Sequence, residues 1–253
     1  MPKKFFVTTP IYYMNGSPHL GHYYATTVAD TLARVFRQKN GSFFLTGTDE
    51  HGEKVAQKAQ EQGYTPQEFT DRLAQEWRET WHDMDIAYDY FIRTTDKHHR
   101  QFAQYIIQTL KDRGALYEQE YQALYCVGAE SFVSKSDLRE GGLCPDHDET
   151  PQMVDERNWF FPLSEYKSTI RDCIQSDQIQ ITPQSRKNEV LEMLDNAQVT
   201  DFSVTRERVS WGIPVPFDTD QTIYVWIDAL FNYLSAVVAH YDITFQGRDI
   251  TDV

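Results

Sequence analysis

Two histidines and a glycine stand close together near the start of the sequence, in the string HLGH at residues 19–22. Residues 5–9 read FFVTT, which is typical of a short buried strand, and Ser17 and Pro18 are residue types that commonly cap and begin a helix. On a helix, histidines three residues apart share one face, here beside the free N–H groups of the first turn. Such a helix start can bind phosphate, and Gly21 would let a flat base or a ribose approach the backbone. A pair of histidines at a helix start can also be a simple cap or a solvated pair.

A carboxylate follows the next predicted strand. After a helix that the Asn40–Gly41 pair should end, residues 42–47 read SFFLTG, so the pattern predicts a strand, a helix and a parallel strand. Asp49 lies in the string TDEHG at 48–52, at the carboxyl end of that second strand. Open α/β sheets place their ligand-binding groups at this end. The alternative role for Asp49 is to cap the following helix.

The rest of the sequence divides into three parts. Further helices are expected at 53–62, 66–84 and 96–113, and a further strand at 90–94. From about residue 115, aromatic alternations and a GGLCP segment at 141–145 indicate a small loop-rich insertion. After it we expect helices at 165–175 and 188–194, a buried strand at 221–227 and a helix at 228–239. The predicted parts are therefore residues 1–114, the insertion at 115–200, and residues 201–253.

Composition limits the class of protein. With 253 residues, 40% of them hydrophobic and 14% aromatic, the chain can bury a sizeable core. Three cysteines argue against a disulfide framework, and the start of the sequence lacks the apolar segment of a signal peptide, so we expect a cytoplasmic protein with no membrane partner. A net charge of −14 argues against a general DNA or RNA binder, although a local basic patch could still meet tRNA.

Five strings in the same order resemble the methionyl-tRNA synthetase family of class I aminoacyl-tRNA synthetases. They are VTTPIYYMNGSPHLGH at 7–22, FLTGTDEHG at 44–52, YFIRTT at 90–95, WGIP at 211–214 and YVWIDAL at 224–230. The resemblance implies an α/β fold, in which a Rossmann-like parallel sheet is interrupted by the connective-peptide insertion. It also implies that the second half of the catalytic fold is incomplete in residues 201–253, because the family's second signature, KMSKS, is not met at its expected place.

The resemblance implies a nucleotide site at the HLGH string. In the family, His19 and His22 stabilise the charge that develops on ATP when the amino acid carboxylate attacks the phosphate, which is electrostatic catalysis. Asn15 and Gly21 complete the implied ATP-binding set. The implied cofactors are ATP and Mg²⁺.

The resemblance also implies a methionine site. Asp49 would hold the ammonium group of the amino acid, and a carboxylate is a natural partner for that cation. The methionine-binding residues that match the family are Ile11, Tyr13, Asp49, Arg206, Trp226, Ala229 and Tyr233. Aromatic edges suit a thioether, whereas Arg206 could face carboxylate or phosphate charge, or could be a surface arginine.

The insertion resembles the family's zinc-binding connective peptide, with one ligand replaced. The family pattern pairs Cys-x-x-Cys with Cys-x-x-His, and this sequence has Cys126, Cys144 and His147 but Ala129 at the fourth position. Structural zinc takes four ligands, so three ligands and a water would make a weak or partial site, and bound zinc is doubtful. The oxygen ligands that could substitute are those of Glu130, Asp146 and Asp148.

Three functions remain open at this point. The first is the catalytic-domain portion of a methionine–tRNA ligase, which activates methionine with ATP and, in the complete enzyme, transfers it to tRNA. For this portion alone we expect little or no activity, because half of the phosphate site would be missing. The alternatives are a truncated synthetase-like protein that activates or binds a methionine-like amino acid outside translation, and a non-catalytic binding module. None of the three predicts a DNA or membrane partner.

Overall fold

A parallel sheet built around β3 (Ser42–Asp49) forms the centre of the computed structural model, which describes residues 5–129, 131–134, 137–146, 148–195, 199–207 and 209–241. β1 (Phe5–Thr8) and β2 (Tyr12–Tyr13) pair with one edge of β3, and β4 (Tyr90–Arg93) pairs with the other. All three pairings are parallel, with Phe5 opposite Ser42 at the start of β3. The α/β class and the strand–helix–strand start expected from the sequence are confirmed.

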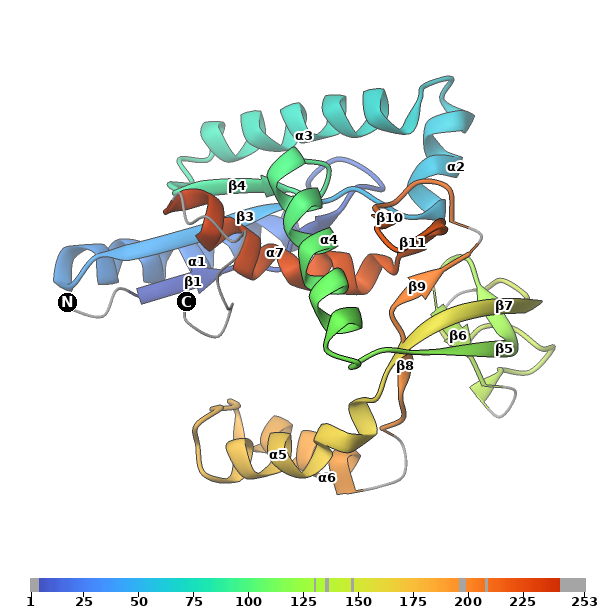
Figure 1. Ribbon diagram of the computed structural model, residues 1–253. Coiled ribbons are helices and arrows are strands. Elements are labelled where there is room, and N and C mark those ends of the chain that lie inside the picture. Colours follow the sequence, from blue (N-terminus) through green and yellow to red (C-terminus); the bar gives the residue numbers. More distant parts are fainter. Residues whose placement is uncertain are drawn as a thin grey trace.

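Helices cover both faces of this sheet (Figure 1). α1 (Leu20–Lys39) connects the two halves of the first β–α–β unit, and α2 (Glu53–Glu61) and α3 (Pro66–Asp83) connect β3 to β4. α1 and α3 pack on one face, whereas α4 (Lys97–Asp112) and α7 (Val225–His240) lie against the other. The sheet is thus the middle layer of three.

The alternation of side chains along β3 divides the core between these layers. Phe44 packs into a cluster with Trp77 and Trp81 of α3, and both tryptophans are completely buried. The next residue, Leu45, points to the opposite face, where it joins Ile92 of β4 and Ala236 of α7. Successive side chains of a strand point to opposite faces, so the apolar residues of β3 pack against the helices on both faces of the sheet.

α1 differs from its prediction at its start, and its large apolar side chains lie on its outer surface. The helix begins at Leu20, and His19 takes the cap position that the sequence suggested for Ser17. Its buried residues are small or polar, with Ala29 and Ala33 among them, whereas Val28 and Leu32 are exposed. The small residues allow close approach to the sheet, which leaves the larger apolar side chains on the outer surface.

The insertion forms an antiparallel sheet with a helical hairpin beside it (Figure 1). The sheet order is β6-β5-β7-β8, with bounds β5 (Tyr117–Cys126), β6 (Ser131–Val133), β7 (Gln152–Phe161) and β8 (Phe202–Ser203). The hairpin consists of α5 (Leu163–Gln175) and α6 (Gln184–Asp195), which contact each other. β5 begins at Tyr117, and the division of the chain at residues 115 and 200 remains a prediction.

A second small sheet leads into α7. Its order is β10-β11-β9, with bounds β9 (Thr205–Arg206), β10 (Pro214–Val215) and β11 (Asp218–Ile223). The prediction of a strand at 221–227 was wrong in its second half, because β11 ends at Ile223 and Val225 already belongs to α7. Trp226 therefore stands on the first turn of a helix. An apolar run such as IYVWI fits a buried strand and a buried helix start equally well.

Across the described ranges, no helix combines the length and the apolar character that crossing a membrane requires.

Candidate active site

Asp49 lies at the carboxyl end of β3, where β2 is paired with it. Tyr13 stands opposite Asp49 in the register, and the Met14 N–H donates to the Asp49 carbonyl at 3.0 Å. The Asp49 residue is buried, with 7% of its surface exposed. β2 leads directly into the loop before α1, so the pairing places Asp49 at the same end of the sheet as the HLGH string.

The next residue, Glu50, is held by a buried ion pair to β4. The guanidinium of Arg93 donates to both carboxylate oxygens, with Nε at 2.7 Å and Nη2 at 2.8 Å, and Nη2 also meets Asp71 of α3 at 2.6 Å. Trp211 adds a hydrogen bond from Nε1 to the Glu50 carbonyl at 2.6 Å. Burial alone would lower the pKa of Arg93, but the two carboxylates outweigh it and raise that pKa, so the guanidinium stays charged.

His51 extends the same segment in the opposite direction, toward α7 and α4. Its Nδ1 lies 2.7 Å from one carboxylate oxygen of Asp228, and the other oxygen of Asp228 lies 2.6 Å from Nε2 of His99. Nδ1 of His99 lies 2.7 Å from the hydroxyl of Ser235. All four side chains are buried. Burial would raise the pKa of Asp228, but the two histidines hold that pKa below its usual range, so the carboxylate is ionised.

The HLGH string forms the first turn of α1 and lies at the surface. The His19 ring accepts the Gly21 N–H at Nδ1, at 3.1 Å, and the His22 ring accepts the His19 N–H at 3.2 Å. The two rings stack with centroids 3.6 Å apart, and the His22 ring also contacts Trp77. Burial and the neighbouring His19 lower the pKa of His22, which favours a neutral ring. The two histidines thus cap the helix reciprocally and face solvent.

The loop between β2 and α1 borders a cavity of about 340 Å³. Asn15 lines this cavity, and its carbonyl accepts a hydrogen bond from Lys58 of α2. Trp77 donates from Nε1 to the Gly16 carbonyl at 3.1 Å, and Arg72 also lines the cavity. The cavity therefore places two cations beside the loop that precedes the two histidines.

The residues expected to bind the methionine side chain differ in their packing. Ile11 and Tyr233 pack on one cluster with Leu45 and Ile92, and Ala229 is buried on the same helix as Tyr233. Tyr13 packs against the cluster between α2 and α3. Trp226 is 56% exposed and stands on the first turn of the helix that carries Ala229 and Tyr233. The structure thus brings Ile11 and Tyr233 together on one cluster.

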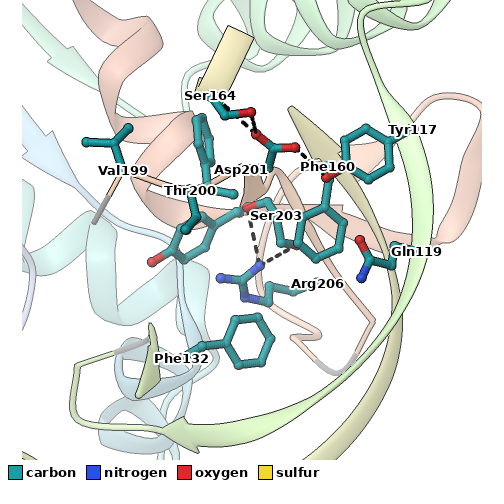
Figure 2. A pocket seen from close by; sticks show the side chains of 12 residues that line it. Tyr117, Gln119, Phe132, Phe160, Ser164, Val199, Thr200, Asp201, Ser203 and Arg206 are labelled. Carbon is teal, nitrogen blue, oxygen red and sulfur yellow. Dashed lines mark hydrogen bonds between the residues drawn. The ribbon is translucent and has the colours of Figure 1, made fainter. Parts of the chain in front are cut away.

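Arg206 is buried and lines a different cavity, of about 750 Å³, between the insertion sheet and β9 (Figure 2). Its guanidinium lies 4.5 Å from the Phe132 ring and 3.7 Å from the Tyr224 ring, and Nη1 donates to the Ser203 hydroxyl at 2.8 Å. In the described part of the chain Arg206 forms no ion pair. Burial lowers the pKa of Arg206. The surface position considered for this arginine is therefore wrong.

The expected zinc position contains two thiols. Cys126 and Cys144 are both buried, and the Ala129 N–H donates to Sγ of Cys126 at 3.4 Å. Burial, together with the hydrogen bond to Cys144, raises the pKa of Cys126. His147 and Glu130 lie outside the described residues, and within those residues no group of three or more metal-ligating side chains occurs.

Sequence reasoning missed the two buried networks beside Asp49. Glu50, His51 and Asp228 belong to strings that carry the resemblance, but the sequence assigns none of them a role, and His99 lies outside these strings. A signal was available: Asp228 is the only ionised residue type between Val225 and Ala239, in a helix whose other residues are mostly apolar. A charge in such a helix needs a buried partner.

Comparison with known proteins gives consistent matches. The family model described as tRNA synthetases class I (M) matches residues 5–150 and 142–247. The methionine–tRNA ligase of Streptomyces coelicolor is 41% identical over 244 residues, which is 93% of this chain and 45% of that protein, and the Thermotoga maritima enzyme is 42% identical over 92% of this chain and 38% of that protein. The crystal structure of Mycobacterium tuberculosis methionyl-tRNA synthetase bound by methionyl-adenylate superposes with a TM-score of 0.88 at 32% identity, covering 99% of this chain and 48% of that one. The chain therefore spans less than half the length of these relatives.

Proposed function

The chain belongs to the class I tRNA synthetases of the methionine type, and we propose that it carries the amino acid half of a methionine-activating site. The reaction would join the methionine carboxylate to the α-phosphate of ATP, giving methionyl-adenylate and pyrophosphate. Transfer of the methionyl group to tRNA would follow in the complete enzyme. The observation that carries this proposal is the buried Asp49 at the carboxyl end of β3, at the same end of the sheet as the helix start that holds His19 and His22.

Asp49 would bind the ammonium group of methionine. Its carboxylate stands in a largely buried position, and an ion pair there is screened less than one in water. The thioether would then lie toward the cluster that contains Ile11 and Tyr233, with Ala229 nearby on α7. A thioether packs well against aromatic edges, and the small Ala229 side chain would leave room for it.

The helix start would bind the phosphates of ATP. The positive end of the α1 dipole and the two imidazoles favour negative charge at this place. As the carboxylate attacks, charge builds on the phosphate oxygens, and hydrogen bonds from His19 and His22 would stabilise it. Mg²⁺ would enter with ATP and be held mainly by phosphate oxygens and water.

Methionine binding tests the amino acid half directly. Isothermal calorimetry with the 253-residue chain should detect methionine, and Asp49→Asn should weaken the affinity about 10-fold or more, because a hydrogen bond to a charged group contributes about 1.5–3 kcal/mol. Asp83→Asn, at the exposed end of α3, is the matched control and should leave the affinity unchanged. An equal affinity in the Asp49 variant and the parent would refute the role of Asp49.

The chain alone should show little methionine-dependent exchange between ATP and pyrophosphate. The described cations near the helix start are Lys58 and Arg72, and the phosphate site would otherwise depend on the two imidazoles. Robust exchange by the purified chain would show that this half of the site is sufficient for catalysis.

A further inference from the structure

Three elements that are far apart in sequence are joined by one buried hydrogen-bonded chain, which we call the His51–Asp228–His99 link. His51 follows β3, His99 belongs to α4, and Asp228 belongs to α7. Asp228 is 177 positions from His51 and 129 positions from His99. Each oxygen of Asp228 meets a different histidine, at 2.7 and 2.6 Å. All three residues are at least 97% buried.

The ends of this link are next to the two halves of the proposed methionine site. His51 is two residues after Asp49, the expected ammonium ligand. Asp228 is the residue before Ala229, and Tyr233 stands one helical turn further along the same helix. The link therefore spans from the segment that would hold the ammonium group to the helix that would hold the thioether.

We propose that the His51–Asp228–His99 link is a positioning device that sets the separation between Asp49 and α7, and thereby the side-chain length that the site accepts. This inference rests on the proposed methionine site. His51, His99 and Asp228 are positioning residues here, because they act through Asp49, Ala229 and Tyr233 rather than on the substrate.

Directional bonds explain why charged and polar groups would serve this purpose better than apolar ones. A buried ion pair is weak evidence for stability, since apolar side chains of similar volume often stabilise a fold as well or better. Apolar contacts are non-directional, and they leave a helix able to slide along its neighbours. A hydrogen bond weakens steeply outside a narrow range of length and angle. Because Asp228 is bonded on both oxygens, movement of α7 toward one histidine would lengthen the bond to the other.

The position of α4 supports the same reading. α4 and α7 make extensive contact, and α4 also carries the apolar residues Ala103 and Ile107 that pack against the second small sheet. His99 is completely enclosed and uses both ring nitrogens, one on Asp228 and one on Ser235. Ser235 stands two turns after Asp228 on the same helix, so the His99 imidazole is hydrogen-bonded to α7 at two places.

The ratio of the affinities for two amino acids of different side-chain length tests the positioning role, because a loss of folding stability alone would not change this ratio. The affinities of the chain for methionine and for ethionine, its S-ethyl analogue, would be measured by calorimetry at a temperature where each variant is folded. An apolar pocket of fixed length discriminates one methylene group by about 10–200-fold. His99→Leu breaks the link, His99→Gln keeps a donor for Asp228, and His98→Leu is the matched control on the neighbouring position of α4.

We expect His99→Leu to lower the preference for methionine over ethionine at least about threefold, His99→Gln to restore most of it, and His98→Leu to leave it unchanged. An unchanged preference in folded His99→Leu would overturn the positioning role. If the parent chain binds neither amino acid, the proposed methionine site is refuted, but the link is not yet tested. Amide hydrogen exchange of the parent and of His99→Leu would then test the link. Faster exchange in His99→Leu at both residues 49–52 and the first turns of α7 would support the link, and faster exchange confined to α4 would overturn it.

Discussion

The two halves of the proposed site are built in opposite ways. The segment from Asp49 to His51 is buried and is fixed on one side by Arg93 and on the other by Asp228. The segment from His19 to His22 lies at the surface, where its two imidazoles accept backbone N–H groups of their own turn and stack on each other. The sheet end is thus preorganised, whereas the helix start is open.

This difference indicates how each half would meet its ligand. A preorganised carboxylate binds an ammonium group without first ordering itself, which reduces the free-energy cost of binding. An exposed helix start gains its geometry from the phosphates that it binds, and its contribution is electrostatic. Mutations should therefore cost much folding stability at the sheet end and little at the helix start.

The largest loss of stability is expected for Arg93→Met. This change leaves Glu50 completely buried without its cation, and breaking a buried ion pair by removing one partner typically costs about 3–5 kcal/mol. Urea unfolding followed by circular dichroism would measure it. Arg37→Met, which removes a more exposed pair with Asp89, is the matched control and should cost no more than about 1 kcal/mol. Equal losses in the two variants would show that burial of the Glu50–Arg93 pair adds no stability to the sheet end.

Asp228 should make the sheet end sensitive to acid. The histidines hold the pKa of Asp228 below its unfolded value, so its stabilisation is present above about pH 4 and is lost as pH falls through the folded-state pKa. Asp228→Asn should cost about 1.5–3 kcal/mol at neutral pH. The difference in unfolding free energy between the parent and this variant should shrink as pH is lowered from 5 to 2. A difference that stays constant over this range would show that Asp228 is not ionised in the folded protein.

The sequence predicted the backbone of this arrangement better than its polar interior. The apolar β-branched and aromatic runs at residues 5–9 and 42–47 predict their strands. The place of Asp49 follows from the parallel pairing of these strands. The partner of Glu50 is 43 residues away and that of His51 is 177 residues away, and local patterning carries no information on such contacts. The prediction for the start of α7 was wrong for a related reason. Val225 and Trp226 have strand propensity, and tertiary packing overrides propensity.

A smaller loss is expected for His19→Ala. The substitution removes the side chain that caps α1, and loss of a cap typically costs about 1 kcal/mol. Urea unfolding would measure the loss, and calorimetry should find the methionine affinity unchanged because Asp49 and α7 are untouched. Ser17→Ala serves as the control, since His19 rather than Ser17 occupies the cap position. A loss above about 3 kcal/mol would mean that the helix start is held as firmly as the sheet end.

The smallest net change is expected for Gly21→Ala, for which two opposing effects nearly cancel. Alanine is favoured over glycine within a helix by about 1 kcal/mol. The added Cβ would lie 3.1 Å from Cε1 and 3.2 Å from Nδ1 of His19, so the imidazole must shift, and Nδ1 is the atom that accepts the capping hydrogen bond. The unfolding free energy should therefore change by no more than about 0.5 kcal/mol. A gain of a full 1 kcal/mol would show that the His19 ring moves aside freely. Folding stability thus places a weak demand on this position, and under the proposed function we expect the glycine to allow the close approach of a nucleotide to the helix start.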